Sequence, residues 1–279
     1  MRTNAWYTME RRWIPSTGHD IALYIFRPRK NTRPQAQTPG VLWIHGGGYV
    51  VGMAKMIYLS RAMALVKKYG AVVVTPEYRL AGEAPYPAAL EDCYAALCYL
   101  KEHAEELGVC PERLMVGGES AGGGLTAALC MLARDRGEVG IAYQMPLYPM
   151  LDDRDTDSSR ANRDPVWNTK RNHRAWRAYL GPLWGGEAPP YAVPARQTDY
   201  AGLPPTYTFV SATEPFYCET MTYVEHLRKA GVEAQIDVYP RGCHAFDMLL
   251  PFLPVSRRAI AAFERAFCHA AEHYTRKQP

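Results

Sequence analysis

Short runs of apolar, β-branched and aromatic residues recur along the chain and predict the strands of a sheet. Between most of these runs lie longer stretches with a helical pattern, at 54–69, 87–107, 121–136, 217–230 and 255–274. Strands that alternate with helices imply a mostly parallel sheet with helices on both faces. In chain order the predicted strands are 41–45 (VLWIH), 71–75 (AVVVT), 113–117 (RLMVG), 141–148 (IAYQMPLY), 206–212 (TYTFVSA) and 234–240 (AQIDVYP).

The start of the chain has a different pattern. The stretches 8–14 (TMERRWI) and 21–28 (IALYIFRP) alternate apolar and polar residues and are separated by the segment Pro15–Gly18. They predict an antiparallel hairpin, which would form one edge of the sheet. A polar, proline-containing loop at 31–40 follows. The predicted fold class is therefore α/β.

The segment 151–200 departs from the alternation of strands and helices. It is rich in Asp, Arg, Trp, Pro and Gly, and it predicts one helix near 169–180 within otherwise irregular chain. An irregular segment of this length is more often functional than idle. We therefore expect one domain over residues 1–279, in which 151–200 is an insertion that forms a lid or lines a pocket.

Composition narrows the class of protein. Hydrophobic residues make up 48% and charged residues 22%, and the net charge of +4 is too balanced to indicate a nucleic-acid partner. No segment reaches the roughly 18 apolar residues of a membrane span, and the N-terminus lacks the apolar stretch of a signal peptide. The seven cysteines are scattered without a metal-like CxxC pair. We expect free thiols, a cytoplasmic protein and no metal site.

The sequence Gly118-Glu119-Ser120-Ala121-Gly122 matches G-x-S-x-G, with a predicted strand before it and a predicted helix after it. In such a sharp strand-to-helix turn a serine is exposed at the carboxyl edge of the sheet, where it can act as a nucleophile. The helix N-terminus favours negative charge beside it. The alternative is a glycine-rich helix start that serves only packing.

A second glycine-rich segment, His45-Gly46-Gly47-Gly48, directly follows the predicted strand 41–45. Glycines let backbone N–H groups approach an oxyanion that a β-carbon would obstruct. We assign the donors to Gly47, Gly48 and Ala121, and expect His45 to brace the loop rather than to transfer protons. A phosphate-binding loop is the alternative, but the chain has neither GxxxxGK[ST] nor GxGxxG here.

A serine nucleophile needs a base and an acid, in the chain order serine, acid, histidine. His244 follows the strand 234–240 and a short loop, so it is the candidate base; a structural histidine is the alternative. Glu214 follows the preceding strand and is the candidate acid that orients His244. Asp237 lies within a predicted strand and Asp247 lies beyond the histidine, so both fit less well.

Five blocks of the chain, in the right order, resemble the hormone-sensitive-lipase-like family of α/β-hydrolase carboxylesterases. The resemblance implies an α/β-hydrolase fold and an enzyme without a cofactor that acts on small-molecule esters with short acyl chains. Family members usually have aspartate where Glu214 stands. The blocks are HGGGY (45–49), PEYRLAGEAPYPAALEDCYAAL (76–97), GGESAGGGL (117–125), YAVPARQTDYAGLPPTYTFVSATEP (191–215) and GCHAF (242–246).

The resemblance also bears on the pocket and on assembly. Many relatives carry a longer N-terminal part that forms a helical cap; only 44 residues precede HGGG here, which predicts a reduced cap with a lid supplied mainly by 166–180. Relatives are often homodimers, which leaves a homodimer open for this chain. The candidate substrate-binding residues are Tyr49, Glu119, Trp167 and Phe216, with Tyr148 as a further pocket wall.

The predicted reaction is acyl transfer from an ester to Ser120 and then to water. Two other functions stay open. The same triad could serve an amidase or formamidase, because the nucleophile does not reveal the leaving atom. The fold also occurs in ligand receptors without catalytic activity, but these typically lack a triad residue, whereas serine, histidine and an acid all occur here.

Overall fold

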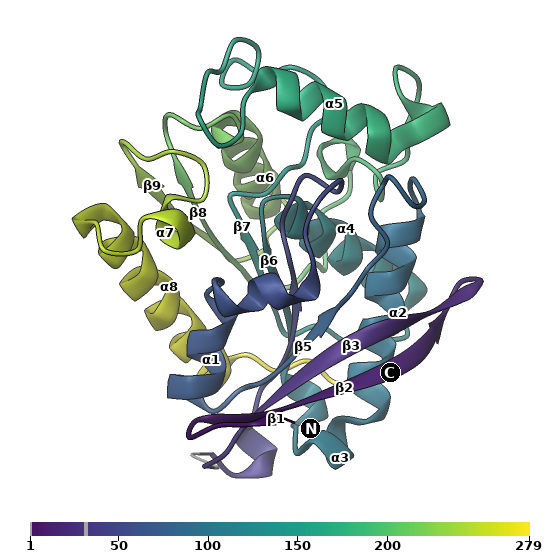
Figure 1. Cartoon of the computed structure of the whole chain (residues 1–279), viewed down its shortest axis with the longest axis vertical. Helices are drawn as coiled ribbons and strands as arrows, with labels where there is room; N and C mark the ends of the chain where they lie inside the picture. The colour runs from purple at the N-terminus through teal and green to yellow at the C-terminus, as the bar shows by residue number, and fades with distance from the viewer. Residues whose placement is uncertain (1, 31–32) are drawn as a thin grey trace.

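The computed structural model describes residues 2–30 and 33–279, in which the strands form one nine-stranded sheet (Figure 1). Asn31 and Thr32 of the predicted loop at 31–40 lie outside the described residues. The strand order is β1-β2-β3-β5-β4-β6-β7-β8-β9. The strands are β1 (Arg2–Thr3), β2 (Tyr7–Ser16), β3 (His19–Pro28), β4 (Gly40–Ile44), β5 (Val72–Pro76), β6 (Leu114–Glu119), β7 (Tyr143–Leu147), β8 (Thr206–Ser211) and β9 (Ala234–Tyr239).

The predicted N-terminal hairpin is confirmed as β2 and β3, which pair antiparallel at one side of the sheet. β3 also pairs antiparallel with β5, whereas all pairs from β5 to β9 are parallel. The turn is tighter than the sequence predicts, because Pro15 lies inside β2, opposite Asp20. Among the described residues, β1 pairs with β2 at Thr8 and Met9, so the outer edge of β2 is open at Pro15. Proline has no N–H to donate, and at an open edge no strand needs that donor.

Helices cover both faces of the sheet, as the alternation predicts. They are α1 (Ala62–Tyr69), α2 (Ala88–Glu102), α3 (Ala104–Leu107), α4 (Ala121–Arg136), α5 (Thr169–Leu180), α6 (Tyr217–Lys229), α7 (Phe246–Leu249) and α8 (Pro254–His273). None of the helices in the described part of the chain is both long and apolar enough to cross a membrane.

Successive side chains of β4 divide the core in two. Val41 and Trp43 belong to the buried cluster that includes α1 and α8, whereas Leu42 and Ile44 belong to the cluster that includes α2, α4 and α6. This division follows from the period of two along a strand. A strand buried on both faces carries apolar residues at every position, and all five residues of β4 are buried.

The predicted helix at 54–69 is two pieces, a 3-10 helix at Ala54–Tyr58 followed by α1. Ser60 separates them: its hydroxyl donates to the Ile57 carbonyl (3.0 Å) and accepts from the Ala62 N–H (3.1 Å). The side chain thus ends the first piece and satisfies a free donor at the start of the second. The predicted helix at 87–107 is likewise divided at His103 into α2 and α3.

Helix α4 approaches β4 very closely at Gly122. A Cβ atom at this position would lie 2.1 Å from the Ile44 carbonyl oxygen and 2.6 Å from that of His45. Backbone cannot move aside as a flexible side chain can, so glycine is required for this contact. The contact holds the start of α4 next to the loop that follows β4.

We predict that Gly122→Ala destabilises the protein by about 1–3 kcal/mol, the usual range for overpacking a core. A loss of stability would be informative, because replacing glycine by alanine in a helix interior otherwise stabilises a protein by about 1 kcal/mol. Urea unfolding followed by circular dichroism measures the difference. Gly82→Ala is the control, since nothing lies within 4 Å of a Cβ atom there; equal stability of the two variants would contradict the prediction.

Candidate active site

A sharp turn between β6 and α4 carries Ser120. Its backbone has φ 58° and ψ −120°, a region that non-glycine residues rarely adopt and that costs about 1–3 kcal/mol. Two hydrogen bonds to the segment at the end of β7 hold the turn. The Ser120 N–H donates to the Leu147 carbonyl, and the Met150 N–H donates to the Ser120 carbonyl, both at 3.0 Å. The strained residue is therefore tied on both sides.

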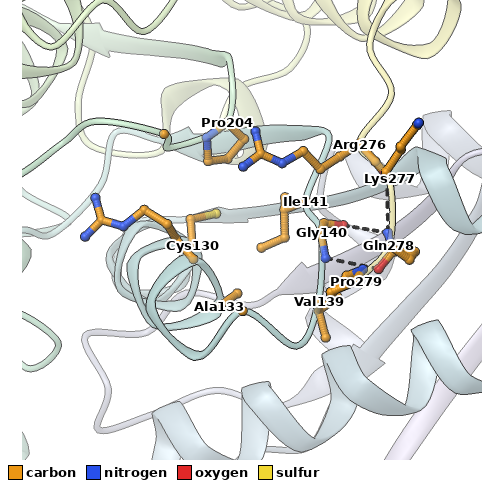
Figure 2. A pocket seen from close by; sticks show the side chains of 13 residues that line it. Cys130, Ala133, Val139, Gly140, Ile141, Pro204, Arg276, Lys277, Gln278 and Pro279 are labelled. Carbon is orange, nitrogen blue, oxygen red and sulfur yellow. Dashed lines mark hydrogen bonds between the residues drawn. The ribbon is translucent and has the colours of Figure 1, made fainter.

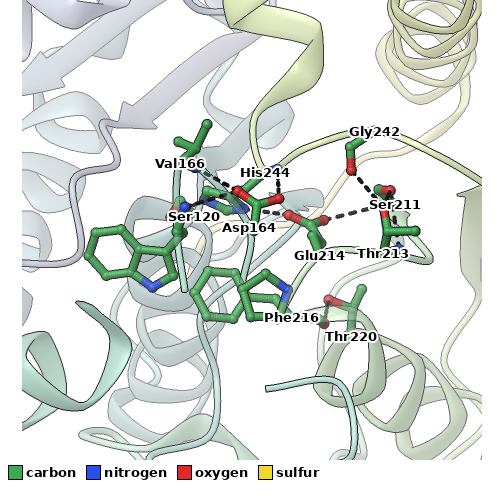
Figure 3. Close-up of polar contacts among 12 residues, drawn as sticks. Ser120, Asp164, Val166, Ser211, Thr213, Glu214, Phe216, Thr220, Gly242 and His244 are labelled. Carbon is green, nitrogen blue, oxygen red and sulfur yellow. Dashed lines mark hydrogen bonds and ion pairs between the residues drawn. The ribbon is translucent and has the colours of Figure 1, made fainter. Parts of the chain in front are cut away.

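Ser120, His244 and Glu214 form a continuous chain of hydrogen bonds (Figure 3). The Ser120 hydroxyl lies 2.8 Å from Nε2 of His244, and Nδ1 of His244 contacts Oε2 of Glu214. The Ser211 N–H donates to the other carboxylate oxygen of Glu214 at 3.2 Å. The three side chains come from loops after β6, β8 and β9, because the carboxyl ends of parallel strands meet at one edge of the sheet.

Burial and neighbouring groups act in opposite directions on Glu214. Burial, the largest effect, and the nearby Asp164 raise the pKa of its carboxyl above the usual value, and the imidazole of His244 and the Ser211 N–H offset this only in part. The carboxylate is thus held next to the ring atom at which positive charge would develop if His244 accepted a proton. Such a charge is stabilised more in a buried site than in water.

Two aromatic rings fix the imidazole of His244 from its sides. Tyr148 and Phe216 each meet it edge-to-face, with ring centroids 5.2 and 5.0 Å away and interplanar angles of 82° and 87°. Phe216 is fully buried and does not line the cavity at Ser120, contrary to the prediction that it binds substrate. Its contact instead keeps the imidazole ring between Ser120 and Glu214.

The HGGG loop brings free N–H groups next to Ser120. Among residues 2–30 and 33–279, no protein acceptor takes a hydrogen bond from the N–H of Gly47, Gly48 or Ala121. Gly47 and Gly48 have φ 122° and 61°. On Gly47 a Cβ atom would lie 1.8 Å from the Val51 carbonyl oxygen, and on Gly48 it would lie 2.0 Å from the Trp167 ring. Backbone blocks a Cβ atom at Gly47, and the positive φ at both positions favours glycine.

His45 braces this loop. Its Nδ1 lies 2.7 Å from the Gly46 carbonyl, and its ring stacks on Tyr78, whose hydroxyl donates to the His45 carbonyl at 2.9 Å. Burial lowers the pKa of His45 to about 4. The ring is therefore neutral near pH 7 and holds no charge beside the free N–H groups.

A mostly apolar cavity of about 260 Å³ opens at Ser120. Glu119, Trp167 and Tyr148 line it, as expected from the sequence. Tyr49 does not: it is buried behind the cavity, stacks on Tyr179 of α5 and donates to the Met150 carbonyl at 3.0 Å. Val166 of the predicted lid segment also lines the cavity, together with residues that sequence reasoning did not single out, namely Trp43, Met56, Ile57, Ser60, Ala245, Met248 and Leu249.

Glu119 is a buried carboxyl within this cavity wall. The Trp43 indole N–H donates to its Oε2 at 2.9 Å. Burial, together with the neighbouring carboxylate of Asp247, raises the pKa of Glu119 to about 8. Arg61 forms an ion pair with Asp247 (3.2 Å) and lies close enough to Glu119 to lower its pKa in part. Glu119 is therefore mostly protonated at neutral pH.

Asp164 was not identified from the sequence, yet it contacts the main chain of His244. Its Oδ2 accepts from the His244 N–H at 2.8 Å, and its Oδ1 accepts from the N–H groups of Val166 and Trp167 at 2.8 and 3.0 Å (Figure 3). The pair Asp164-Pro165 is a turn signal. Nothing local indicates that the second oxygen reaches a residue 80 positions later.

A separate cavity of about 300 Å³ lies at the opposite, amino-terminal end of the parallel strands (Figure 2). Gln278 closes one side through hydrogen bonds with the N–H and carbonyl of Gly140, at 3.0 and 2.9 Å. The thiol in its wall, Cys130, is buried, which raises its pKa far above the usual range. This thiol is therefore a poor nucleophile. No group in the described ranges has the arrangement of a metal site.

Comparisons with known proteins agree with this geometry. A family model described as alpha/beta hydrolase fold matches residues 41–248. Esterase LipI of Mycobacterium tuberculosis is 36% identical over 208 residues, 72% of this chain and 63% of LipI, so the match spans under two thirds of that relative. Ethyl acetate hydrolase of Pseudomonas putida is 30% identical over 82% of this chain and 72% of its own. The structure titled bacterial heroin esterase superposes with a TM-score of 0.90 and 34% identity, over 96% of this chain and 86% of that one.

We predict that Glu119→Gln changes how stability depends on pH. Because the folded-state pKa is raised to about 8, wild type loses stability as the pH rises from the unfolded-state value of 4.5 towards 8. Glutamine cannot ionise, so over this window the stability of the variant should rise relative to that of wild type by up to about 1.4 kcal/mol per pH unit. Urea unfolding at pH 5, 6.5 and 8 measures the difference. The exposed Glu187→Gln should track wild type; parallel curves for all three proteins would refute the assignment.

Proposed function

The chain belongs to the hormone-sensitive-lipase-like family of α/β-hydrolase esterases, and we propose that it is a serine carboxylesterase acting on short-chain acyl esters. One observation carries the proposal: Ser120 is hydrogen-bonded to His244, which contacts Glu214, and the serine faces a cavity beside three unused N–H groups. A nucleophile, an oriented base and oxyanion donors are the parts that acyl transfer requires.

The proposed reaction has two stages. His244 Nε2 takes the Ser120 proton as the hydroxyl oxygen attacks the ester carbonyl, and the resulting oxyanion is held by the N–H groups of Gly47, Gly48 and Ala121. The imidazolium, stabilised by Glu214, then protonates the departing alcohol, which leaves an acyl-serine. Water, activated by His244, attacks this ester in the same way, so that the acid is released and Ser120 regains its proton.

The size of the cavity supports a preference for short acyl chains. At about 260 Å³ it is small, and the Trp167 ring lies against the oxyanion loop at Gly48, where it narrows the space above the nucleophile. Two relatives carry names that fit small acyl esters, ethyl acetate hydrolase and heroin esterase. A third support is the apolar lining, which suits an acyl chain better than a charged substrate.

We further propose that 151–200 is a lid within a single domain. Its helix α5 packs across the carboxyl edge of the sheet, above the loops that carry the candidate site (Figure 1). Trp176 and Tyr179 of α5 contact Tyr49, which follows the HGGG loop. Val166 and Trp167 from the same segment reach the cavity itself.

We predict that Ser120→Ala removes ester hydrolysis and that wild-type activity falls as the acyl chain lengthens. Removing the nucleophile of a triad costs about 10⁶ in kcat, so the variant should be indistinguishable from background. Hydrolysis of p-nitrophenyl acetate, butyrate and octanoate, with unfolding curves to verify the fold of the variant, measures both effects.

Each outcome of this measurement decides something. A preference for octanoate over acetate would overturn the short-chain specificity and leave the esterase intact. Activity retained by Ser120→Ala would overturn the nucleophile. If wild type hydrolyses no ester, matched anilide and formamide substrates test the amidase alternative with the same triad.

We predict that Glu214→Gln lowers kcat by about 10³–10⁴, with little change in KM, because an amide cannot stabilise the imidazolium. Glu214→Asp, which restores the acid usual in the family, should keep more activity than the glutamine variant. Asp237→Asn is the matched control, since Asp237 lies within β9 and accepts a hydrogen bond from the Tyr207 hydroxyl rather than contacting His244. A larger loss for Asp237→Asn than for Glu214→Gln would show that the acid is assigned wrongly.

A further inference from the structure

We propose that Asp164 is a positioning residue that couples the lid to the base: one carboxylate oxygen holds the main chain of His244, and the other holds the turn that places Trp167 over the oxyanion loop. This inference rests on the proposed function and adds to it a residue outside the triad. It predicts that two properties, turnover and acyl-chain selectivity, depend on a side chain that does not touch the reacting atoms.

Three backbone donors converge on this carboxylate from two separate parts of the chain. Val166 and Trp167 donate to Oδ1 at 2.8 and 3.0 Å, and His244 donates to Oδ2 at 2.8 Å. Asp164 is 8% exposed, and no basic side chain of the described residues forms an ion pair with it. Backbone N–H groups therefore replace water as its solvation, which fixes the orientation of both oxygens.

The bonds to Oδ1 alone would be an ordinary local turn, in which an aspartate or asparagine oxygen binds N–H groups two and three residues on. The hydrogen bond that Oδ2 accepts is not part of such a local turn. It crosses 80 residues of sequence to the candidate base, and asparagine could not accept with both oxygen positions. A local turn therefore does not explain why both sides of this side chain are used.

The main chain at His244 needs such a partner. The next residue, Ala245, has φ 58°, in the left-handed region that disfavours a residue with a β-carbon. The His244 N–H is buried, and without Asp164 it would have no acceptor among the described residues. The Asp164 bond thus holds the loop in the conformation that brings Nε2 to Ser120.

The same carboxylate positions a wall of the pocket. The turn from Asp164 to Trp167 puts the indole ring where a Cβ atom on Gly48 would lie 2.0 Å from it. Arg171 from α5 donates to the carbonyls of Pro165 and Val166, so the carbonyl side of this turn is secured separately. The N–H side depends on Asp164.

The test compares Asp164→Asn and Asp164→Ala with the control Asp157→Asn, whose side chain is 92% exposed in the same segment. Asparagine keeps one acceptor for the turn but presents an amide N–H₂ to the His244 N–H. We expect it to lower kcat for p-nitrophenyl acetate by about 10- to 100-fold, as misplacement of a catalytic group does, and to leave the acetate-to-octanoate ratio of kcat/KM unchanged.

Alanine removes both contacts. It should lower kcat at least as much and also shift the acetate-to-octanoate ratio towards octanoate by about threefold or more, because the main-chain N–H groups of the turn that places Trp167 against Gly48 lose their acceptor. Asp157→Asn should match wild type in both quantities. Each rate is normalised to the folded fraction, so a general loss of stability cannot mimic a change in the ratio.

Two results would overturn the inference. One is a kcat for Asp164→Asn within threefold of the Asp157→Asn control, and the other is an unchanged ratio in Asp164→Ala. Should Asp164→Asn fail to fold, Asp164→Ser takes its place, since serine can accept in the turn but is too short to reach His244. The same loss of kcat with the same retained ratio is expected of it.

A second readout separates failure of this inference from failure of the proposed function. The rate at which a fluorophosphonate probe labels Ser120 depends on His244 but not on the natural substrate. If wild type labels rapidly but hydrolyses no ester, the esterase proposal fails, and slower labelling of Asp164→Asn still supports the positioning role. If wild type hydrolyses esters and the Asp164 variants label and turn over like the control, the positioning role alone fails.

Discussion

The strand-to-helix turn at Ser120 constrains most of the surrounding structure. Its strained backbone is maintained by hydrogen bonds of its N–H and carbonyl groups to Leu147 and Met150, respectively. The helix that starts there must pass so close to β4 that Gly122 has no room for a side chain. The loop after β4 is thereby brought beside Ser120, which is why the free N–H groups of Gly47 and Gly48 lie near it. One tight turn thus places the proposed nucleophile and limits where the proposed oxyanion donors can be.

Three buried carboxyl groups surround the site, and each is accommodated by a different means. Glu214 contacts an imidazole, so its charge has a partner that becomes positive in the proposed reaction. Asp164 is solvated by three backbone N–H groups. Glu119 accepts from the Trp43 indole, but burial still raises its pKa to about 8, so that it stays largely protonated. Ionised carboxylates are costly to bury unless paired, and these arrangements keep charge next to His244 but away from the oxyanion donors.

The segment 151–200, which we propose as a lid, contacts the rest of the structure at two places near the cavity. Its α5 packs on Tyr49, and Asp164 accepts a hydrogen bond from the main chain of His244. Trp167 lies between these attachments, against Gly48. In the proposed function these contacts make the segment a wall of defined position, and the proposed acyl-chain selectivity depends on how the turn at Asp164 is held.

The sequence alone was enough to predict the alternation of strands and helices after the hairpin, the hairpin itself and the positions of α4 and α5, because period, turn residues and short motifs are local properties. It also singled out Ser120, His244 and Glu214, which the structure brings into contact. Tertiary structure decided what depends on distant partners. Phe216 and Tyr49 read as pocket walls but pack behind the cavity, Pro15 lies in a strand because its edge is open, and Asp164 acts across 80 residues. A motif places its own residues; which side chains meet from separate loops is fixed only when the sheet brings the loops together.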